Sequence, residues 1–316
     1  MRKKSLLLFM VLVLVVLSAA GCGPKKPASS STDAVFAEVK DANGRTVKLP
    51  KKPERIVVAS ASFLEPLHEV GGKIVARPES KTINPDFAKD IPSIGRVYNI
   101  DVEKLLACNP DLVVLNKATN EKLIQPLETA GIPVIVAHLK SYDDVKDGIR
   151  LFASVTGEKA KGDKLIADMD NKIETIKGKI PKKELRVLIL HGTSQGLSVQ
   201  LESSIGGSVA KMLGFTNVAA GMKAMDDKPD AAPYSIETVV EQNPDIIFVT
   251  SMGKIDDIKA SMEQTMKSNP AWQSIPAVRD NKIYYLSQEL FLLSPCIHYP
   301  EAVEEMAKLI YPEAFK

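Results

Sequence analysis

The sequence contains little cysteine, histidine and tryptophan. Its 316 residues include three cysteines, four histidines and one tryptophan. Three cysteines are too few for a disulfide-rich scaffold. The histidines show no His-x-His pair and no histidine-rich loop, so their spacing does not point to a zinc or manganese centre. They are His68, His138, His191 and His298.

The sequence also lacks an excess of either charge. It has 41 Lys+Arg and 39 Asp+Glu. Three of the basic residues, at positions 2–4, belong to an N-terminal segment that we expect to be removed, which leaves 38 basic residues against 39 acidic ones. A nearly neutral chain does not have the basic surface that nucleic-acid binding requires, so we expect no nucleic-acid partner.

The N-terminus has the organisation of a secretory signal. Its basic residues precede an apolar run, Leu6–Leu17, and small residues follow. This run is too short to cross a bilayer, which favours a cleaved signal peptide over residues 1–21. Leu17–Cys22 resembles the bacterial lipoprotein box, in which the cysteine is acylated; ordinary cleavage leaving a free thiol is the alternative. We therefore expect lipidation at Cys22 and an extracytoplasmic protein anchored to the cell membrane, at the bacterial cell surface or in the periplasm.

A tether and a hairpin follow the expected cleavage site. Residues 22–35 are rich in Pro, Lys and Ser without periodicity, which predicts a lipidated flexible tether. Segments 36–40 and 45–49 alternate in polarity, and the turn signal Asn43-Gly44 lies between them. This pattern predicts a β-hairpin.

The rest of the chain alternates short apolar strands with helices. Continuous Val/Ile/Leu strands between helices are typical of mainly parallel sheets covered on both faces. Roughly 290 residues after the leader exceed one typical core. We therefore predict an α/β fold with two Rossmann-like lobes, joined by a long linking α-helix. The expected strands are 55–60, 111–115, 133–137, 186–190, 245–249 and 282–286; the expected helices are 63–70, 102–108, 121–130, 205–213, 236–242, 255–267 and 299–310.

An internal repeat supports two related lobes. Residues 101–114 match residues 235–248, with a glutamate at the third position of each segment. In both segments an Asn-Pro-Asp sequence follows, and its aspartate lies eight positions after the glutamate. Chance does not explain a match between two segments of this length, so we interpret them as equivalent parts of two lobes.

A helical segment separates the two halves. Ser141–Asp144 is typical of a helix start and Gly157 of a break. Beyond it, apolar residues recur at spacings of three or four and form one helical stripe, which comprises Leu165, Met169, Ile173, Ile176 and Ile180. A helix over 158–179 would be roughly 33 Å long.

We therefore expect an N-terminal lobe at 36–140, a helical linker at 141–184 and a C-terminal lobe at 185–316. This division places Cys108 and Cys296 in different lobes, so we do not expect them to pair.

Several motifs together resemble one known family. The segments 45–58, 101–114, 235–248 and 277–284, in this order after a lipoprotein box, are similar to the helical-backbone class of ABC-importer substrate-binding proteins. The similarity covers the chain from about Phe36 to its end. The resemblance implies a monomeric binding protein, without enzymatic activity or an intrinsic cofactor. Such a protein carries a small metal chelate to a permease dimer in the membrane, and the class serves ferric siderophores, haem and cobalamin.

The resemblance also implies docking residues. In the family, one glutamate on each lobe enters an arginine pocket of the permease, and the matching positions are Glu103 and Glu237. Two carboxylates on one rigid body fit two cationic pockets and define an orientation. The alternative is that each is a solvated glutamate favoured by a helix N-terminus, after Asp101 and Ser235.

Candidate ligand-binding residues come from expected loops. Most of these loops follow an expected strand, whereas Arg96 and Tyr98 lie in a short loop over 95–99, just before the helix of Glu103. In open α/β sheets, ligands bind beyond the carboxyl ends of the strands. Tyr98 and Met252 also match the positions that supply axial haem ligands in the haem-binding branch, although the usual residues there are methionine and histidine; either could ligate haem iron. The candidates are Ser62, Arg96, Tyr98, Lys117, Thr193, Met252 and Phe291.

Other ligands and functions are less favoured. Few arginines lie in the candidate loops, which disfavours a highly anionic siderophore, and we favour haem or a ferric siderophore over cobalamin. A bare Zn²⁺ or Mn²⁺ ligand is a second alternative. Gly192–Gly196 matches the G-x-S-x-G motif of serine hydrolases, but the alternating pattern after Ser194 predicts a strand where that motif needs a helix. We therefore do not expect an enzyme.

Overall fold

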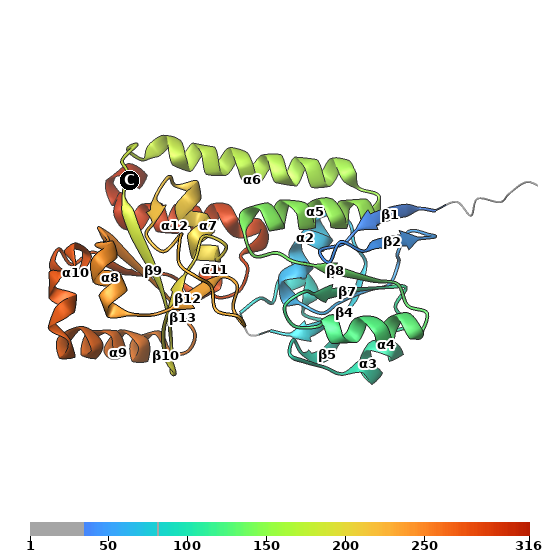
Figure 1. Cartoon of the computed structure of the whole chain (residues 1–316). Coiled ribbons are helices and arrows are strands. Elements are labelled where there is room, and N and C mark those ends of the chain that lie inside the picture. Colours follow the sequence, from blue (N-terminus) through green and yellow to red (C-terminus); the bar gives the residue numbers. More distant parts are fainter. Residues whose placement is uncertain (1–34, 81) are drawn as a thin grey trace, which may run out of the picture. The chain divides into compact units, whose positions relative to one another are not determined.

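The computed structural model describes residues 35–80 and 82–316 (Figure 1). The predicted signal peptide, the site at Cys22 and nearly all of the predicted tether lie outside the described residues. The predicted hairpin is confirmed: β1 (Ala37–Lys40) pairs antiparallel with β2 (Thr46–Leu49).

The first sheet contains six strands in the order β6-β5-β4-β3-β7-β8. All neighbours are parallel except β5 and β6. The strands β3 and β8 are apolar and fully buried, and β7 is apolar and buried up to its last residue, Asn116, as their sequences predict. The strands are β3 (Ile56–Val58), β4 (Ile74–Glu79), β5 (Ser93–Arg96), β6 (Asn99–Ile100), β7 (Leu112–Asn116) and β8 (Val134–Ala137), and the α-helices are α2 (Leu64–Glu69), α3 (Val102–Ala107) and α4 (Ile124–Thr129).

The strands β4, β5 and β6 were not predicted from the sequence. The strand β4 ends on Arg77-Pro78-Glu79, so its second half is polar and carries no apolar pattern. Residues 95–99, expected to form a loop, instead form most of the tight β5–β6 hairpin. This correction places Tyr98 in a two-residue turn between strands.

The second sheet is mixed. Its order is β12-β10-β9-β13-β14, and β11 also pairs with β9. The neighbours β9, β13 and β14 are parallel, whereas β10 is antiparallel to both β9 and β12. The strands are β9 (Arg186–Thr193), β10 (Gly196–Gln200), β11 (Thr216–Asn217), β12 (Ala231–Pro233), β13 (Ile246–Ser251) and β14 (Ile283–Tyr285). The α-helices are α7 (Ile205–Met212), α8 (Ile236–Gln242), α9 (Ile255–Ser268), α10 (Pro276–Arg279), α11 (Gln288–Phe291) and α12 (Tyr299–Ile310).

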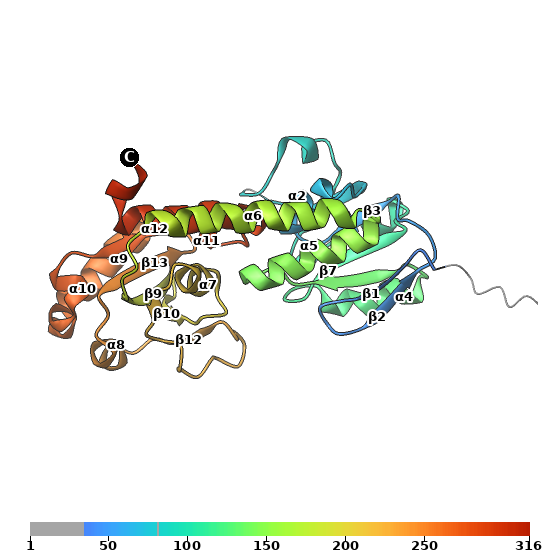
Figure 2. The same cartoon turned by 90° about the horizontal axis from the view of Figure 1, so that it is seen from above.

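Two helices connect the sheets. Ser141 and Asp144 form a capping box at the start of α5 (Tyr142–Thr156), and Gly157 ends this helix with a φ of 75°. The next helix, α6 (Lys159–Lys179), confirms the predicted long helix. Figures 1 and 2 show α6 running alongside both α5 and α12. Its apolar stripe is buried in a cluster that contains residues of both sheets, so the linker shares one core with the elements it joins.

The cysteines in the described region are unpaired. Cys108 is partly exposed and Cys296 is buried, and both are free thiols.

Candidate functional site

A cleft of about 350 Å³ lies between elements of the two halves. One wall comes from the segment after β3 and from the loop after β4, and the other comes from α11 and the residues before α12. Its lining mixes polar and apolar side chains. The polar ones carry hydroxyl, amide, carboxyl and imidazole groups and include Ser62, Glu65, Asn84, Glu289, Ser294 and His298, and the apolar ones include Ile83, Pro85 and Leu290. Of the seven predicted ligand-binding residues, Ser62 alone appears in this lining.

One hydrogen bond joins the two walls of the cleft. The Nε2 atom of His298 lies 3.0 Å from Oε2 of Glu65. Glu65 lies in the first turn of α2, and His298 immediately precedes α12. This hydrogen bond with Glu65 raises the pKa of His298 above its ordinary value, and burial opposes part of that effect. Glu301 also raises this pKa, whereas Lys172 on α6 lowers it.

The charge of His298 leads to a pH prediction. Since its pKa is raised in the folded chain, its stabilising contribution is full below a pH of about 6.5 and is lost as the pH rises through the folded pKa. We expect His298→Gln to lower the free energy of unfolding at a pH of about 5.5 and to have less effect at about 8.5. The side chain is 44% exposed, so the effect should stay below about 1 kcal/mol. Chemical denaturation of both proteins measures it.

The comparison must use the difference between variant and wild type. Burial lowers the pKa of His138 and of His191, so these two residues make the wild-type chain more stable as the pH rises. Their contribution cancels in the difference. An equal effect of His298→Gln at both pH values would contradict the prediction.

Arg96 and Tyr98 lie on the β5–β6 hairpin. Tyr98 is 76% exposed, and Arg96 at the end of β5 is also exposed. A side chain from another loop stabilises the turn: the Nδ2 group of the buried Asn120 donates a hydrogen bond of 2.8 Å to the carbonyl of Val97. The hairpin therefore presents the phenol of Tyr98 to solvent beyond the strand end.

Thr193 is the last residue of β9, and Met252 follows the neighbouring strand β13. Met252 is 55% exposed, and its N–H donates to the carbonyl of Gly192 at 3.0 Å. Thr193 Oγ1 donates to the carbonyl of Gly196 and accepts from the N–H of Gln195, closing the turn between β9 and β10. Met252 thus offers a free thioether, whereas the hydroxyl of Thr193 is engaged within its own turn.

The same turn contains the G-x-S-x-G sequence. Ser194 lies between β9 and β10, and the strand β10 begins two residues later. The predicted strand is confirmed, so the serine is not at the strand-to-helix turn that a hydrolase nucleophile requires.

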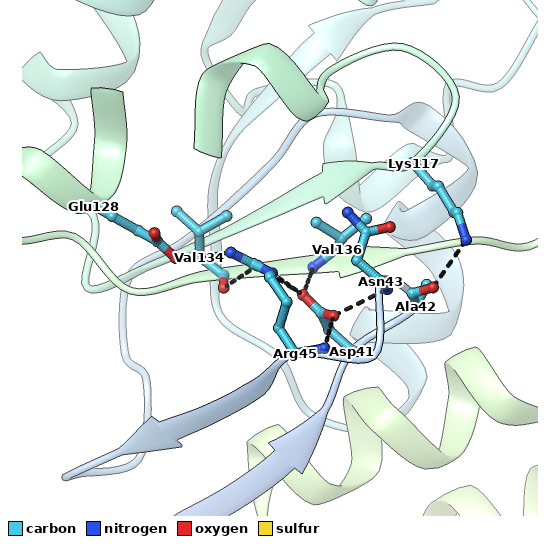
Figure 3. Close-up of polar contacts among 8 residues, drawn as sticks. All are labelled: Asp41, Ala42, Asn43, Arg45, Lys117, Glu128, Val134 and Val136. Atoms are coloured by element: carbon cyan, nitrogen blue, oxygen red, sulfur yellow. Dashed lines mark hydrogen bonds and ion pairs between the residues drawn. The ribbon is translucent and has the colours of Figure 1, made fainter. Parts of the chain in front are cut away.

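Two predicted ligand-binding residues are placed differently from the expectation. The Nζ atom of Lys117 donates a hydrogen bond of 3.0 Å to the carbonyl of Ala42 in the β1–β2 turn, as Figure 3 shows. Phe291 is 2% exposed and packs in the shared core. Phe291 ends α11, which was expected to be a loop, and its inward ring presents almost no surface to a ligand in this structure.

The four histidines have separate environments. His68 stacks on Phe87 with 3.8 Å between ring centroids, and His191 Nδ1 lies 2.9 Å from Thr250 Oγ1. His138 Nε2 lies 3.6 Å from a carboxylate oxygen of Asp144. Within residues 35–80 and 82–316, no three histidine, cysteine, aspartate or glutamate residues gather as a metal-binding group.

The candidate docking residues occupy equivalent positions. Glu103 lies in the first turn of α3 and Glu237 in the first turn of α8, and both are exposed. Asp101 and Ser235 cap these helices by accepting from backbone N–H groups. Ser235 also donates to Glu237 at 2.7 Å, which lowers the pKa of the Glu237 carboxyl. This carboxyl is therefore ionised at neutral pH.

The contact between Glu65 and His298 was not predicted from the sequence. They lie 233 positions apart, and His298 was noted only as one of four scattered histidines. No local sequence pattern distinguishes either residue. The only available signal was their position, because Glu65 follows the strand β3 and His298 directly precedes α12.

The chain resembles known binding proteins along its whole length. Residues 56–290 match the family described as periplasmic binding protein. The chain is 26% identical over 330 residues to YvrC, an uncharacterized ABC transporter substrate-binding lipoprotein of Bacillus subtilis (strain 168), with 99% of each chain covered. It is 25% identical over 308 residues to the iron-uptake system-binding protein of the same organism, covering 89% of this chain and 90% of that protein. A crystal structure of an ABC transporter substrate-binding protein from Listeria monocytogenes EGD-e has a TM-score of 0.73 at 25% identity, covering 83% of this chain and all of the other.

The fold, the cleft and the similarity to known binding proteins together define the class of this protein. Two α/β lobes on a linking helix, with a cleft of mixed polarity between them, form a solute-binding architecture. The chain belongs to the periplasmic binding protein family. It is an extracytoplasmic, membrane-anchored substrate-binding protein of the ABC-importer type, in the class that includes binding proteins for iron siderophores, haem and vitamin B12. Over the described residues, no helix has both the length and the apolar character to span a membrane.

Proposed function

We propose that this protein captures an iron complex, haem or a ferric siderophore, between its two lobes and delivers it to an ABC permease. The observation that carries the proposal is the cleft between the lobes, together with the exposed Tyr98 and Met252 beyond strand ends of different sheets. In this proposal residues 36–140 and 185–316 are the lobes, 141–184 the linker, and Cys22 the lipidated residue. The protein acts as a monomer.

Three considerations favour an iron complex. A relative of similar length is an iron-uptake system-binding protein. A phenol and a thioether are both groups that ligate haem iron. Exposed apolar surface at Tyr98 and Met252 also suits the large apolar face of a porphyrin, since covering these side chains with such a face removes apolar surface from water.

Titration with haemin tests the haem version. We expect a shift of the Soret band on adding haemin to the wild-type protein. Tyr98→Ala and Met252→Ala should each weaken binding about tenfold or more, because each removes an iron ligand or a stacking surface. Phe291→Leu is a matched control, since this ring is 2% exposed and offers almost no surface for contact.

The other ligands are outcomes of the same experiment. Ferric siderophores, cyanocobalamin, Zn²⁺ and Mn²⁺ are titrated in parallel by calorimetry. If haemin causes no spectral change and a ferric siderophore gives a heat of binding, the ligand is a siderophore and not haem. Binding of cobalamin or of a bare cation alone would overturn the iron-complex proposal.

Glu103 and Glu237 are the proposed docking residues. Both are exposed, lie at matched positions in the two lobes and follow a helix cap. A rigid chain that presents one carboxylate on each lobe suits a permease dimer with one cationic pocket on each subunit. A photocrosslinker at Lys104 or Thr238, next to these glutamates, should attach to the permease in intact cells, and mass spectrometry of the adduct identifies it.

A further inference from the structure

The Asn-Pro-Asp sequence of the internal repeat makes the same contacts in both lobes. In the first lobe, the carboxylate of Asp111 accepts the N–H groups of Glu54 and Arg55, at 2.9 and 2.8 Å. The N–H of Asp111 in turn donates to the carbonyl of Arg55 at 3.0 Å. The side chain of Arg55 donates to the carbonyls of Cys108 and Asn109, at 2.6 to 3.1 Å.

The second lobe repeats this arrangement. The carboxylate of Asp245 accepts the N–H of Arg186 at 3.0 Å, and the N–H of Asp245 donates to the carbonyl of Arg186 at 2.8 Å. Nη2 of Arg186 donates to the carbonyl of Gln242 at 2.6 Å. Gln242 and Cys108 both lie three positions before the aspartate, so the two arginines bind the equivalent carbonyl.

The strand pairing is also equivalent. Arg55 directly precedes β3 and Arg186 begins β9, while the aspartates directly precede β7 and β13. The pairs β3–β7 and β9–β13 are both parallel. The arginine and aspartate are 56 positions apart in one lobe and 59 in the other, so the contact is kept although the intervening chain differs in length.

The contact lies at the end of each helix that carries a candidate docking glutamate. Asn109 and Asn243 have φ values of 46° and 47°, in the left-handed region that ends helices, and a proline follows each. The helices α3 and α8 have only six and seven residues, so they contribute little stability of their own. A guanidinium at the C-terminal carbonyls satisfies acceptors that lack helical partners and complements the helix dipole.

We propose that the contacts Arg55–Asp111 and Arg186–Asp245, with the helix carbonyls that the arginines bind, are two docking clamps. Each clamp ties the end of α3 or α8 to the start of a central strand and thereby orients Glu103 or Glu237 toward the permease. Arg55 and Arg186 are positioning residues, since they act through the glutamates. This inference rests on the proposed docking function.

The test measures binding of the full lipoprotein to its permease, identified by the crosslinking described above and reconstituted in nanodiscs. We expect Arg55→Ala and Arg186→Ala each to weaken permease binding about tenfold, by releasing one glutamate helix. Lysine at either position should restore part of the affinity, because it supplies the charge without the forked geometry. Arg150→Ala is the matched control, since Arg150 is an exposed arginine that pairs with Asp147 on the linker helix α5.

A double-mutant cycle separates positioning from general stability. If Arg55 acts through Glu103, then Arg55→Ala should have little further effect on permease binding once Glu103 is alanine, and the same should hold for Arg186 and Glu237. Hydrogen exchange should show faster exchange in α3 or α8 of the corresponding variant, and ligand affinity should not change.

Two results would overturn the clamp proposal while leaving docking intact. One is full permease affinity in the arginine variants although Glu103→Ala and Glu237→Ala bind weakly. The other is an arginine effect that adds in full to the glutamate effect. If instead the glutamate variants bind normally, the docking function itself fails, and the clamps then have no docking residue to position.

Discussion

The double variant Glu103→Ala/Glu237→Ala is expected to lose permease binding almost completely while keeping its ligand affinity. Removing one partner of a desolvated charge pair at an interface costs about 2–5 kcal/mol. Two such losses at the lower figure correspond to about a thousandfold weaker binding. Both carboxylates are exposed on short capped helices, so their removal leaves the fold unchanged.

Binding to permease nanodiscs measures this effect, with ligand titration of the same samples alongside. The matched controls are Glu121→Ala and Glu241→Ala, which each remove an exposed glutamate from the same lobe as one docking residue. Each single docking variant should lose about half of the free energy lost by the double variant. Equal weakening by the controls would show that net charge, rather than two specific carboxylates, governs docking.

Replacing Asp41 should be the most destabilising single change in the N-terminal hairpin. The carboxylate of Asp41 is fully buried and accepts from the N–H groups of Asn43, Arg45 and Val136. It also pairs with the guanidinium of Arg45 at 2.7 Å, and this guanidinium reaches Glu128 and the carbonyl of Val134, as Figure 3 shows. One side chain therefore joins the hairpin turn to β8.

We expect Asp41→Ala to lower the free energy of unfolding by about 3 kcal/mol or more, because it leaves a partly buried guanidinium and three N–H groups without their acceptor. Urea denaturation measures this loss. Glu38→Ala is the control on the same hairpin, since Glu38 pairs with Lys48 at 3.5 Å with both side chains more than half exposed. That change should cost about 0.5 kcal/mol or less. Similar losses in both variants would contradict the role of the buried network.

Much of the fold was predictable because it is encoded locally. The helix α12 begins and ends at the predicted residues, and α6 differs from the predicted range by one residue. These helices carry regular apolar stripes, and a spacing of three or four residues over one or two turns is enough to predict a helix. The strand β4 was missed because polar residues and a proline follow its apolar start. It forms a strand because it pairs with β3 and β5, and these partners cannot be recognised from its own sequence.

The candidate site was predictable only in part. Met252 follows the expected strand β13, whereas β5, the strand before Tyr98, was not expected from the sequence. The inward turn of Phe291 and the engagement of Lys117 by the β1–β2 turn depend on packing between distant segments, which no short pattern reports.

The sequence alone therefore determined the alternation of strands and helices, the linker helix, and the repeat that relates Glu103 to Glu237. Each of these features depends on apolar periodicity, on the residue types of turns, or on matching residues in two short segments, all of which are local properties of the sequence. The tertiary structure decided the contact of Glu65 with His298 and the two arginine clamps. Those contacts join residues from 53 to 233 positions apart, and only the packing of the sheets brings their atoms within hydrogen-bonding distance.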